Sequence, residues 1–390
     1  MGFVANSCRV FRREVRRMVS RFSYCALLTL LPTAAFAIFG SLFLRSVTGL
    51  PVALLDEDRS PTSRQLAQMI DATSGVDIYC NIASAAEGER LIRCGKARAM
   101  VTLPEGFERD LLGGRQPVVA LYNSGSNLTT NGIVERDVQS AVRTFGVGVQ
   151  LQLLEARGLS SAEAMAVAMP IEVDEHTLFN PCLDYAAYLA PTFMSMTLLI
   201  FAVLATIYAV GSELKESSAR EWLDVGGGSM VAALVGKLAL PTVMVLLWAG
   251  VMFFVLFALL GVALNGSVWL LVLATVIFIV SYESVALLFV ALFDNMRMAL
   301  SLGGGYSVLS FSFSGVTFPS IAMFAPVRIL GYIFPFTYYM KIYVDLVVRG
   351  APVGYALRTM APMMLFCLLP IALLPRLKRV CCDSRYWGKS

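Results

Sequence analysis

Residues 211–237 read GSELKESSAREWLDVGGGSMVAALVGK and form the most polar stretch between two long apolar segments. Residues 185–210 and 238–264 are each long enough to cross a bilayer as a helix. Between them the charged residues come first, and the glycines at 226–228 then end any helix that begins at Glu213. The pattern predicts a short charged helix held at a membrane surface. An ordinary solvated loop between two spanning helices would have a similar composition.

The composition indicates an integral membrane protein. Hydrophobic residues make up 57% of the 390-residue chain and charged residues 15%, and the mean hydropathy is +0.70. Soluble globular domains are roughly 45–50% apolar and about 25% charged. A net charge of +4 is too small to indicate nucleic acid as a partner. The expected partner of so apolar a surface is the lipid bilayer.

The N-terminal region predicts an amphipathic helix followed by a first span. Residues 9–21, RVFRREVRRMVSR, place apolar side chains at helical spacing and arginines on the other faces. We expect residues 1–21 to form a cytoplasmic interfacial helix that lies flat on the anionic leaflet. Residues 22–44 form the first transmembrane helix and lack the small-residue cleavage pattern of a removed signal peptide. Because basic residues precede this span, the positive-inside rule places the N-terminus in the cytoplasm.

Residues 45–180 change character and predict an extracytoplasmic α/β domain, since strand and helix patterns alternate there. Strands are expected at 51–55, 76–79, 97–103 and 118–122, helices at 60–72, 85–93 and 133–156, and an extended stretch at 171–179. Asp56, Glu57 and Asp58 follow the first strand. They could form a metal cluster, although an acidic turn at the end of a strand explains them more simply.

The segment at 45–180 also contains Cys80 and Cys94, which could form a disulfide in an oxidising compartment. The cysteines of the chain follow no metal or redox spacing, and the one histidine, His176, excludes a multi-histidine metal site. No catalytic residues are predicted, and no cofactor. A Walker A motif is absent because Leu238 follows Gly236-Lys237, so any ATP must be bound by another subunit. We expect the chain not to be an enzyme.

Further apolar stretches predict the remaining spans within residues 181–380, at 185–210, 238–263, 268–292, 299–318 and 358–375. With the first span they make six, which puts the loop at 211–237 and the tail at 381–390 in the cytoplasm. The predicted fold is therefore a polytopic α-helical membrane protein with six transmembrane helices and an inserted extracytoplasmic α/β domain.

Residues 319–350 are apolar but divided by prolines into pieces too short to cross, which predicts an outer re-entrant segment. Lys341, Asp345 and Arg349 recur at four-residue spacing, so they share one face of a small helix. We expect that helix to lie along the outer surface.

Glu283 is an acidic residue near the middle of an apolar span, where a charge costs about 3 kcal/mol. It is expected to face protein, water or a partner. Its neighbours Ser281, Tyr282 and Ser284 could hydrogen-bond it. Glu283 is either a structural residue that is protonated or held by hydrogen bonds, or part of a transport pathway or dimer interface.

Together these features resemble the type-2 ABC transporter permeases, the exporter subunits with a large external domain between the first and second spans. The resemblance covers essentially the whole chain. It rests on the basic helix at 9–21, LPVALLDEDRSPTSRQLAQMID at 50–71, the loop at 212–237, and FSGVTFPSIAMFAPVRILGYIFPFTYYMKIYVDLVVRG at 313–350. The loop of the family commonly reads Glu-x-Lys-x-Gly-Thr, and here Ser217 and Ser218 replace the Gly-Thr pair.

The resemblance implies a permease subunit of an ATP-driven exporter in the bacterial inner membrane. Its cargo would be an amphipathic or hydrophobic compound, such as a drug, a lipid-like molecule or a secreted metabolite. The implied partners are a cytoplasmic ATP-binding subunit, a second permease chain, identical or paralogous, and a periplasmic adaptor protein.

The resemblance further implies that the helix from about Glu213 to Leu223 is a coupling helix. Glu213, Lys215, Glu221 and Trp222 would dock into a groove on the ATPase. Trp222 could instead lie at the membrane–water boundary. An alternative class is a signalling receptor or scaffold that uses the external domain to bind a ligand or a protein. A receptor would in addition need a cytoplasmic output domain.

Overall fold

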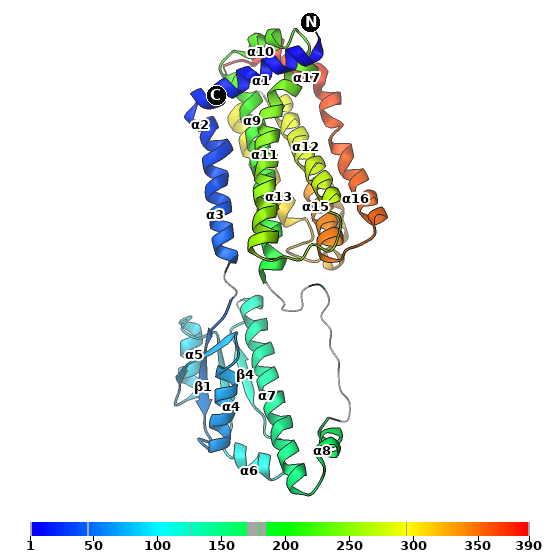
Figure 1. Ribbon diagram of the computed structural model, residues 1–390. Coiled ribbons are helices and arrows are strands. Elements are labelled where there is room, and N and C mark those ends of the chain that lie inside the picture. Colours follow the sequence, from blue (N-terminus) through cyan, green and yellow to red (C-terminus); the bar gives the residue numbers. More distant parts are fainter. Residues whose placement is uncertain are drawn as a thin grey trace. The chain divides into compact units, whose positions relative to one another are not determined.

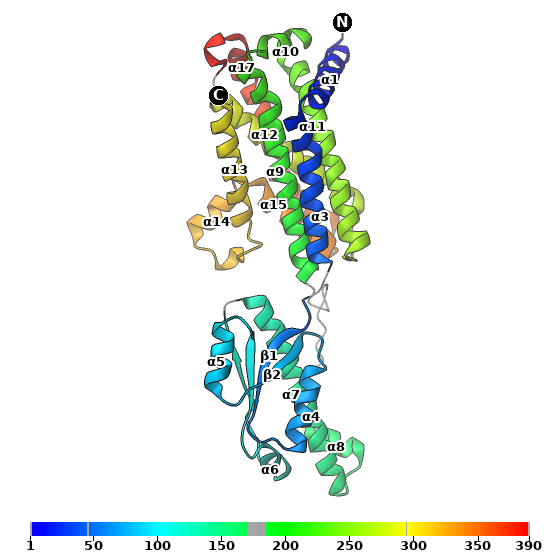
Figure 2. The ribbon, with the colours of Figure 1, turned by 90° about the vertical axis from the view of Figure 1, so that its left-hand side faces the viewer.

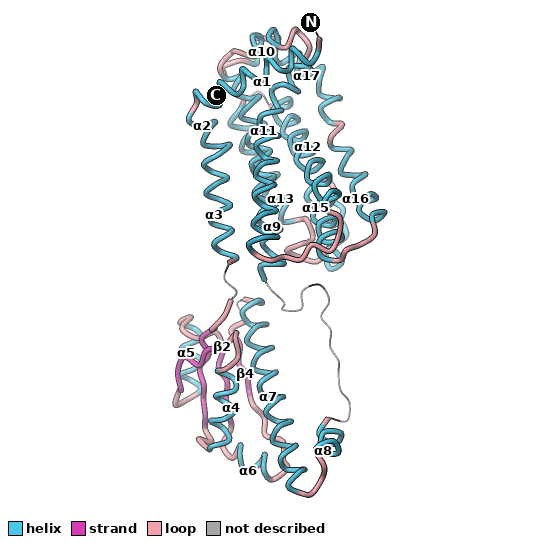
Figure 3. Tube along the Cα trace, in the orientation of Figure 1, coloured by secondary structure: helices cyan, strands magenta, loops and turns pink. Residues whose placement is uncertain are grey.

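The computed structural model describes residues 2–44, 47–125, 127–169, 179, 185–293 and 295–388. The chain folds into two compact units, one formed by Met1–Arg45 with Thr177–Ser390 and the other by Ser46–His176. The first unit is helical, whereas the second contains the strands (Figure 1, Figure 3). The extracytoplasmic location expected for the second unit stays a prediction.

The helical unit begins with α1 (Phe3–Ser20) and α2 (Phe22–Cys25), and a π-helical turn then leads into α3 (Leu31–Phe43). Its later helices are α9 (Tyr185–Lys215), α10 (Ala219–Val225), α11 (Met230–Phe253), α12 (Val268–Leu292), α13 (Met296–Ser312), α14 (Ala325–Gly331), α15 (Pro335–Tyr343), α16 (Val353–Phe366) and α17 (Leu369–Cys382). At one end of this unit α10 contacts both α1 and α17 (Figure 1).

Among the described residues, five helical stretches are long and apolar enough to cross a membrane. They are Phe22–Phe43, Ala187–Lys215, Met230–Leu259, Val268–Leu292 and Val353–Cys382. The chain is thus a polytopic membrane protein. The span predicted at 299–318 corresponds to α13, which has 17 residues. At 1.5 Å per residue α13 is about 26 Å long, slightly less than the roughly 30 Å hydrocarbon core, so a sixth crossing stays a prediction.

α9 and α12 form the centre of the helical unit. In each, 67% of the most apolar window is buried, against 28% or 17% in the other three candidate spans. α9 packs against α11, α12 and α13 (Figure 2). The outer helices keep large apolar side chains exposed, such as Leu247 on α11 and Ile371 on α17. Such faces are expected where a helix meets lipid or another chain.

Residues 319–350 are divided into short pieces, as the prolines predicted. A 3-10 turn, α14, α15 and a π-helical turn at Val344–Val348 follow one another, and each is too short to cross. Tyr339 and Ile342 of α15 are fully buried in the core of the unit. The expected position of this helix along the outer surface of the membrane stays a prediction. Asp345 and Arg349 do share a face, and a nitrogen of Arg349 lies 3.2 Å from Asp345 Oδ1.

The second unit contains a sheet with strand order β2-β1-β3-β4. Its strands are β1 (Leu50–Asp56), β2 (Val76–Asn81), β3 (Ala99–Leu103) and β4 (Ala120–Asn123). β1 pairs in parallel with β2 and β3, and β4 pairs antiparallel with β3. This is the partly parallel α/β layer that the alternating pattern predicted. β1 reads as a continuous apolar run because both of its faces are covered.

Helices cover the two faces of the sheet. Val52 and Leu54 of β1 pack into the cluster under α4 (Pro61–Asp71) and α7 (Leu128–Ala156). Ala53 and Leu55 face the smaller cluster under α5 (Ala85–Arg93) (Figure 2). Two helices were not expected, α6 (Phe107–Leu112) and α8 (Ser161–Ala168). The extended stretch predicted at 171–179 lies outside the described residues, apart from Phe179.

The structure contradicts a disulfide between Cys80 and Cys94, because both are free thiols. Cys80 packs against the apolar cluster that includes Met100, and burial raises the pKa of its thiol. Cys94 caps the C-terminus of α5 and is exposed. The two residues flank one helix in sequence, but their side chains have different environments.

Candidate functional site

The polar stretch at 211–237 contains the end of α9, all of α10 and the start of α11. α9 continues to Lys215, and Ser217 then takes a φ of 59°, a left-handed conformation that interrupts the helix. α10 ends at three glycines, of which Gly227 and Gly228 have φ values of 69° and 71°. Glycine adopts this conformation without steric cost. The single helix expected from about Glu213 to Leu223 is therefore wrong.

Trp222 anchors α10 against α11. Its side chain is fully buried, and its indole N–H donates a hydrogen bond to the Ala233 carbonyl at 3.2 Å. Lys237 Nζ lies 5.3 Å from the centre of the indole ring, within cation–π range. Trp222 therefore lies neither in an exposed docking patch nor at an exposed boundary. Lys215 and Glu221, by contrast, are exposed.

A buried charge cluster lies directly beneath α10 and joins three helices. Lys237 Nζ of α11 donates to Glu14 of α1 at 2.5 Å and to Glu213 of α9 at 2.7 Å. All three side chains are at most 2% exposed. Glu213 also accepts from Arg13 of α1 at 2.5 and 3.2 Å. Charges this deeply buried are tolerated only when they are paired and hydrogen-bonded, and these are.

A second, more exposed layer of ion pairs extends the charge cluster toward the surface. Arg17 of α1 pairs with Glu213 and, at 3.0 Å, with Glu216, and Arg21 also pairs with Glu216. Burial lowers the pKa of Arg17 below its usual value. Partial burial acts to raise the pKa of Glu216, but the Arg21 hydrogen bond and the nearby cations outweigh it and lower that pKa. The basic residues of α1 thus bind the acidic residues of the loop.

The backbone of α1 approaches α11 closely where the latter has a glycine. A Cβ at Gly236 would come within 2.4 Å of the Ser7 carbonyl oxygen and 2.7 Å of Val10 Cβ, so any larger residue would push α1 away. The apolar face of α1, with Phe11, Val15 and Met18, packs on the bundle. The expectation that this helix lies flat on the anionic leaflet stays a prediction.

A basic groove of about 610 Å³ lies between α1 and α10. It is lined by Arg9, Arg12, Arg13, Arg16, Arg17, Ser20, Glu221 and Val225. Arg12 and Arg16 are exposed there. The polar face of α1 thus remains open to an anionic partner, although its apolar face is used inside the protein.

Glu283 is buried within α12 and is hydrogen-bonded across to α11. Thr242 Oγ1 lies 2.9 and 2.8 Å from the two carboxylate oxygens of Glu283. The expected neighbours do not bind it: the hydroxyls of Ser281 and Ser284 donate to carbonyls one turn earlier, and the Tyr282 hydroxyl accepts from the Phe336 N–H. Thr242 also lines an apolar groove of about 420 Å³ between α11 and α17.

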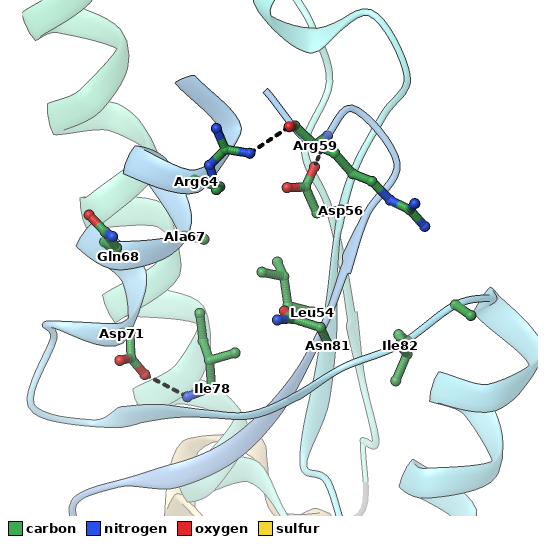
Figure 4. Close-up of a pocket in the computed structure, with 11 residues that line it drawn as sticks. Leu54, Asp56, Arg59, Arg64, Ala67, Gln68, Asp71, Ile78, Asn81 and Ile82 are labelled. Carbon is green, nitrogen blue, oxygen red and sulfur yellow. Dashed lines mark hydrogen bonds between the residues drawn. The ribbon is translucent and has the colours of Figure 1, made fainter. Parts of the chain in front are cut away.

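The acidic turn in the α/β unit is structural. Asp56 accepts hydrogen bonds from the backbone N–H groups of Asp58 and Arg59, and Asp58 accepts from the N–H groups of Gly106 and Glu108. Asp56 lines a cavity of about 690 Å³, where Figure 4 shows its carboxylate turned to the Arg59 backbone. No group of potential metal ligands is present in the described part of the chain.

Sequence reasoning missed Lys237 and Glu14, the residues at the centre of the charge cluster. The predicted span began at 238, whereas α11 begins at Met230, so Lys237 was assigned to the loop. A lone lysine inside an apolar helix is the signal that could have identified it. Glu14 is the one acid within an arginine-rich run of sequence, which is a second usable signal.

Comparison with known proteins identifies the family of the segment that carries Glu213 and Lys237, although α1 with Glu14 lies before the matched residues. The family profile described as ABC-2 family transporter protein matches residues 22–374. The chain is 24% identical over 236 residues to the probable multidrug ABC transporter permease YbhR of Escherichia coli strain K12. The protein of the same name from Escherichia coli O157:H7 matches equally. The aligned region is 60% of this chain and 60% of each relative's length.

Proposed function

The chain belongs to the ABC-2 family of transporter proteins, and we propose that it is a permease subunit that couples ATP hydrolysis on a separate subunit to export. In this proposal the charge cluster, α1 and both termini face the cytoplasm of a bacterial cell, and residues 45–180 face away from it. α13 completes the bundle as the sixth crossing of the inner membrane.

The observation that supports coupling is the connection between α10 and the rest of the unit. Buried Trp222 fixes α10 on α11 through its hydrogen bond to Ala233. On α11, Lys237 forms ion pairs with Glu14 of α1 and Glu213 of α9. A displacement of α10 by the ATPase would therefore move α1, α9 and α11 together. Coupling needs a contiguous packed element of this kind between the two sites.

The contact with the ATPase would involve exposed side chains of the loop. Lys215 and Glu221 are exposed and flank the break between α9 and α10, with Arg220 and Asp224 beside them. Glu213 and Trp222 would act in coupling from inside, by holding α10 to the bundle. This division of roles replaces the expectation that all four docking residues touch the ATPase.

A second permease chain would cover part of the exposed apolar surface of the bundle. The spans Met230–Leu259 and Val353–Cys382 are only 28% and 17% buried in their most apolar windows. A single bundle also offers few helices to enclose a pathway. We therefore place a second permease chain, identical or paralogous, against this unit, and a periplasmic adaptor against the α/β unit.

The proposed cargo is an amphipathic or hydrophobic compound. The two relatives are named probable multidrug ABC transporter permeases, which supports this class for them. In this chain the groove between α11 and α17 is almost wholly aliphatic, and Thr242 in its wall reaches buried Glu283. We propose that Glu283 faces the transport pathway through Thr242.

The test of coupling exchanges exposed charges on the loop. Lys215→Glu combined with Glu221→Lys keeps the net charge and leaves buried Trp222 untouched. Exposed ion pairs contribute about 0–1 kcal/mol, so the 3.8 Å contact of Glu221 with Arg13 is a small loss. The matched control exchanges the exposed pair Glu89 and Arg93 on α5.

We expect the loop variant to be inserted normally, to co-purify poorly with its ATPase, and to lose ATP-dependent export in membrane vesicles. The α5 control should resemble the wild type in all three assays. Normal ATPase association and export by the loop variant would refute the assignment of this loop as the coupling element.

A further inference from the structure

The α/β unit contains an apolar groove with a cationic rim, separate from the coupling elements. The groove has a volume of about 600 Å³, within the range of small-molecule sites. Its floor is formed by Leu66 of α4, Phe107 of α6 and Phe145 of α7, all buried, with the two phenyl rings 6.5 Å apart. It continues along the second half of α7, past Val149 and Leu153.

The charged side chains that line this groove are all cationic. Its lining includes Arg115, Arg143 and Arg157, and no Asp or Glu is among the described residues that line it. Arg115 is paired with Asp110 at 3.2 Å. Arg143 and Arg157 are exposed and form no ion pair in the described part of the chain. Two guanidinium groups without an ion-pair partner among the described residues therefore lie beside an apolar surface, about 21 Å apart along α7 and its C-terminal end.

We propose that this groove binds a single-chain anionic amphiphile, with its apolar chain over Phe107 and Phe145 and its carboxylate or sulfonate on the guanidinium group at one end of the groove, that of Arg143 or that of Arg157. The aliphatic and aromatic floor would remove the chain from water, which stabilises the complex in proportion to the buried area. Guanidinium groups match planar and tetrahedral oxyanions through paired N–H donors. A neutral or cationic amphiphile would gain only the first of these contributions.

This inference concerns a ligand site in the α/β unit and does not depend on the proposed coupling role. It also differs from the neighbouring cavity at Asp56. There the carboxylates of Asp56 and Asp71 accept hydrogen bonds from backbone N–H groups of the same unit (Figure 4).

The test uses the full-length protein in lipid nanodiscs and a decanoic acid analogue that carries a diazirine near the end of its chain. After irradiation, mass spectrometry identifies the labelled peptide. We expect labelling within residues 107–119 or 142–154, with at least tenfold less labelling by the matching decanol analogue. Nanodiscs of neutral and of anionic phospholipid should give the same result if the ligand is a free amphiphile and not bilayer lipid.

Two pairs of variants separate charge from shape. Arg143→Gln with Arg157→Gln should reduce labelling by decanoate at least tenfold, whereas Arg90→Gln with Arg93→Gln on α5 should not change it. Gly146→Phe should block the groove, because Gly146 lines it and a Cβ there meets no atom within 4 Å. Gly148 is equally open but does not line the groove, so Gly148→Phe is the matched control.

Equal labelling by the acid and the alcohol would overturn the proposal, as would labelling that Gly146→Phe leaves unchanged. Loss of labelling in the Gly148→Phe and α5 controls as well would also contradict it, since the signal would then not report this groove. Labelling that follows the phospholipid headgroup would assign the surface to the bilayer instead.

Discussion

Replacement of Lys237 by methionine tests the buried charge cluster most directly. The ammonium group of Lys237 lies 2.5 Å from Glu14 and 2.7 Å from Glu213, and its side chain is fully buried. Glu213 would keep Arg13 and Arg17 in the variant, but Glu14 would lose the one ion pair that the described part of the chain shows for it. Removal of one partner from a buried pair costs roughly 3–5 kcal/mol.

This cost should appear mainly as detachment of α1, because Glu14 is the residue left uncompensated. A loss of about 3 kcal/mol would raise the population of the detached state roughly a hundredfold. The assay is limited trypsin digestion of the purified protein, with cleavage followed at the arginines of α1. Cleavage reports the equilibrium population of the open state when opening and closing are fast.

Two further variants make the result specific. Glu14→Gln in the Lys237→Met background removes the orphaned charge and should restore most of the resistance to trypsin, as a double-mutant cycle would show. Lys215→Met removes an exposed lysine of the same loop and should leave cleavage unchanged. Trypsin resistance of Lys237→Met equal to that of the wild type would refute the idea that this cluster holds α1.

Three further predictions follow from the structure. Gly236→Leu should separate α1 from α11 by steric contact and lower the thermal midpoint by several degrees, whereas Gly250→Leu, at an open position of the same helix, should not. Glu283→Gln can keep its hydrogen bond with Thr242 and should reduce export of cationic compounds more than of neutral ones; equal loss of both would contradict a role for the charge. Although burial acts to raise the pKa of Asp58, hydrogen bonds lower it overall, so this residue stabilises the α/β unit above about pH 4 and that stability is lost on acidification through its folded pKa. Asp58→Asn should therefore flatten the acid-unfolding curve measured by circular dichroism.

The sequence alone predicted those parts of the fold that depend only on residues close together in the chain. The apolar runs predicted the long helices, and the prolines of 319–350 predicted short pieces, because these effects act within one segment. The parallel pairing of β1 with β2 and β3 agrees with the alternation of strand and helix patterns, from which a partly parallel sheet was expected. The break of the polar loop at Ser217 was not predicted, since a non-glycine residue with positive φ carries no reliable sequence signature.

The candidate site was harder to predict, because its geometry depends on residues far apart in the chain. Glu14 and Lys237 are separated by more than half of the sequence, and the spacing of each predicts only its own helix. The arginines of α1 fit a membrane-surface helix equally well, and only the packing of α1 on α11 shows that Arg13 and Arg17 turn inward. Similarly, Trp222 matches an interfacial anchor until its hydrogen bond to Ala233 is seen.

The use of charge at this junction has a physical consequence for coupling. A buried ion pair often contributes little net stability compared with apolar residues of the same size, because desolvation offsets the attraction between the charges. Its geometry is restrictive, however: Lys237 can satisfy Glu14 and Glu213 together only when α1, α9 and α11 are in register. An apolar contact would tolerate sliding of one helix past another at small cost. A network of hydrogen-bonded charges loses far more when its partners separate, so small relative shifts are opposed and the three helices move as one body. Such a junction can transmit a displacement of α10 to the bundle with little loss in the joint itself, which is the property that the proposed coupling role requires.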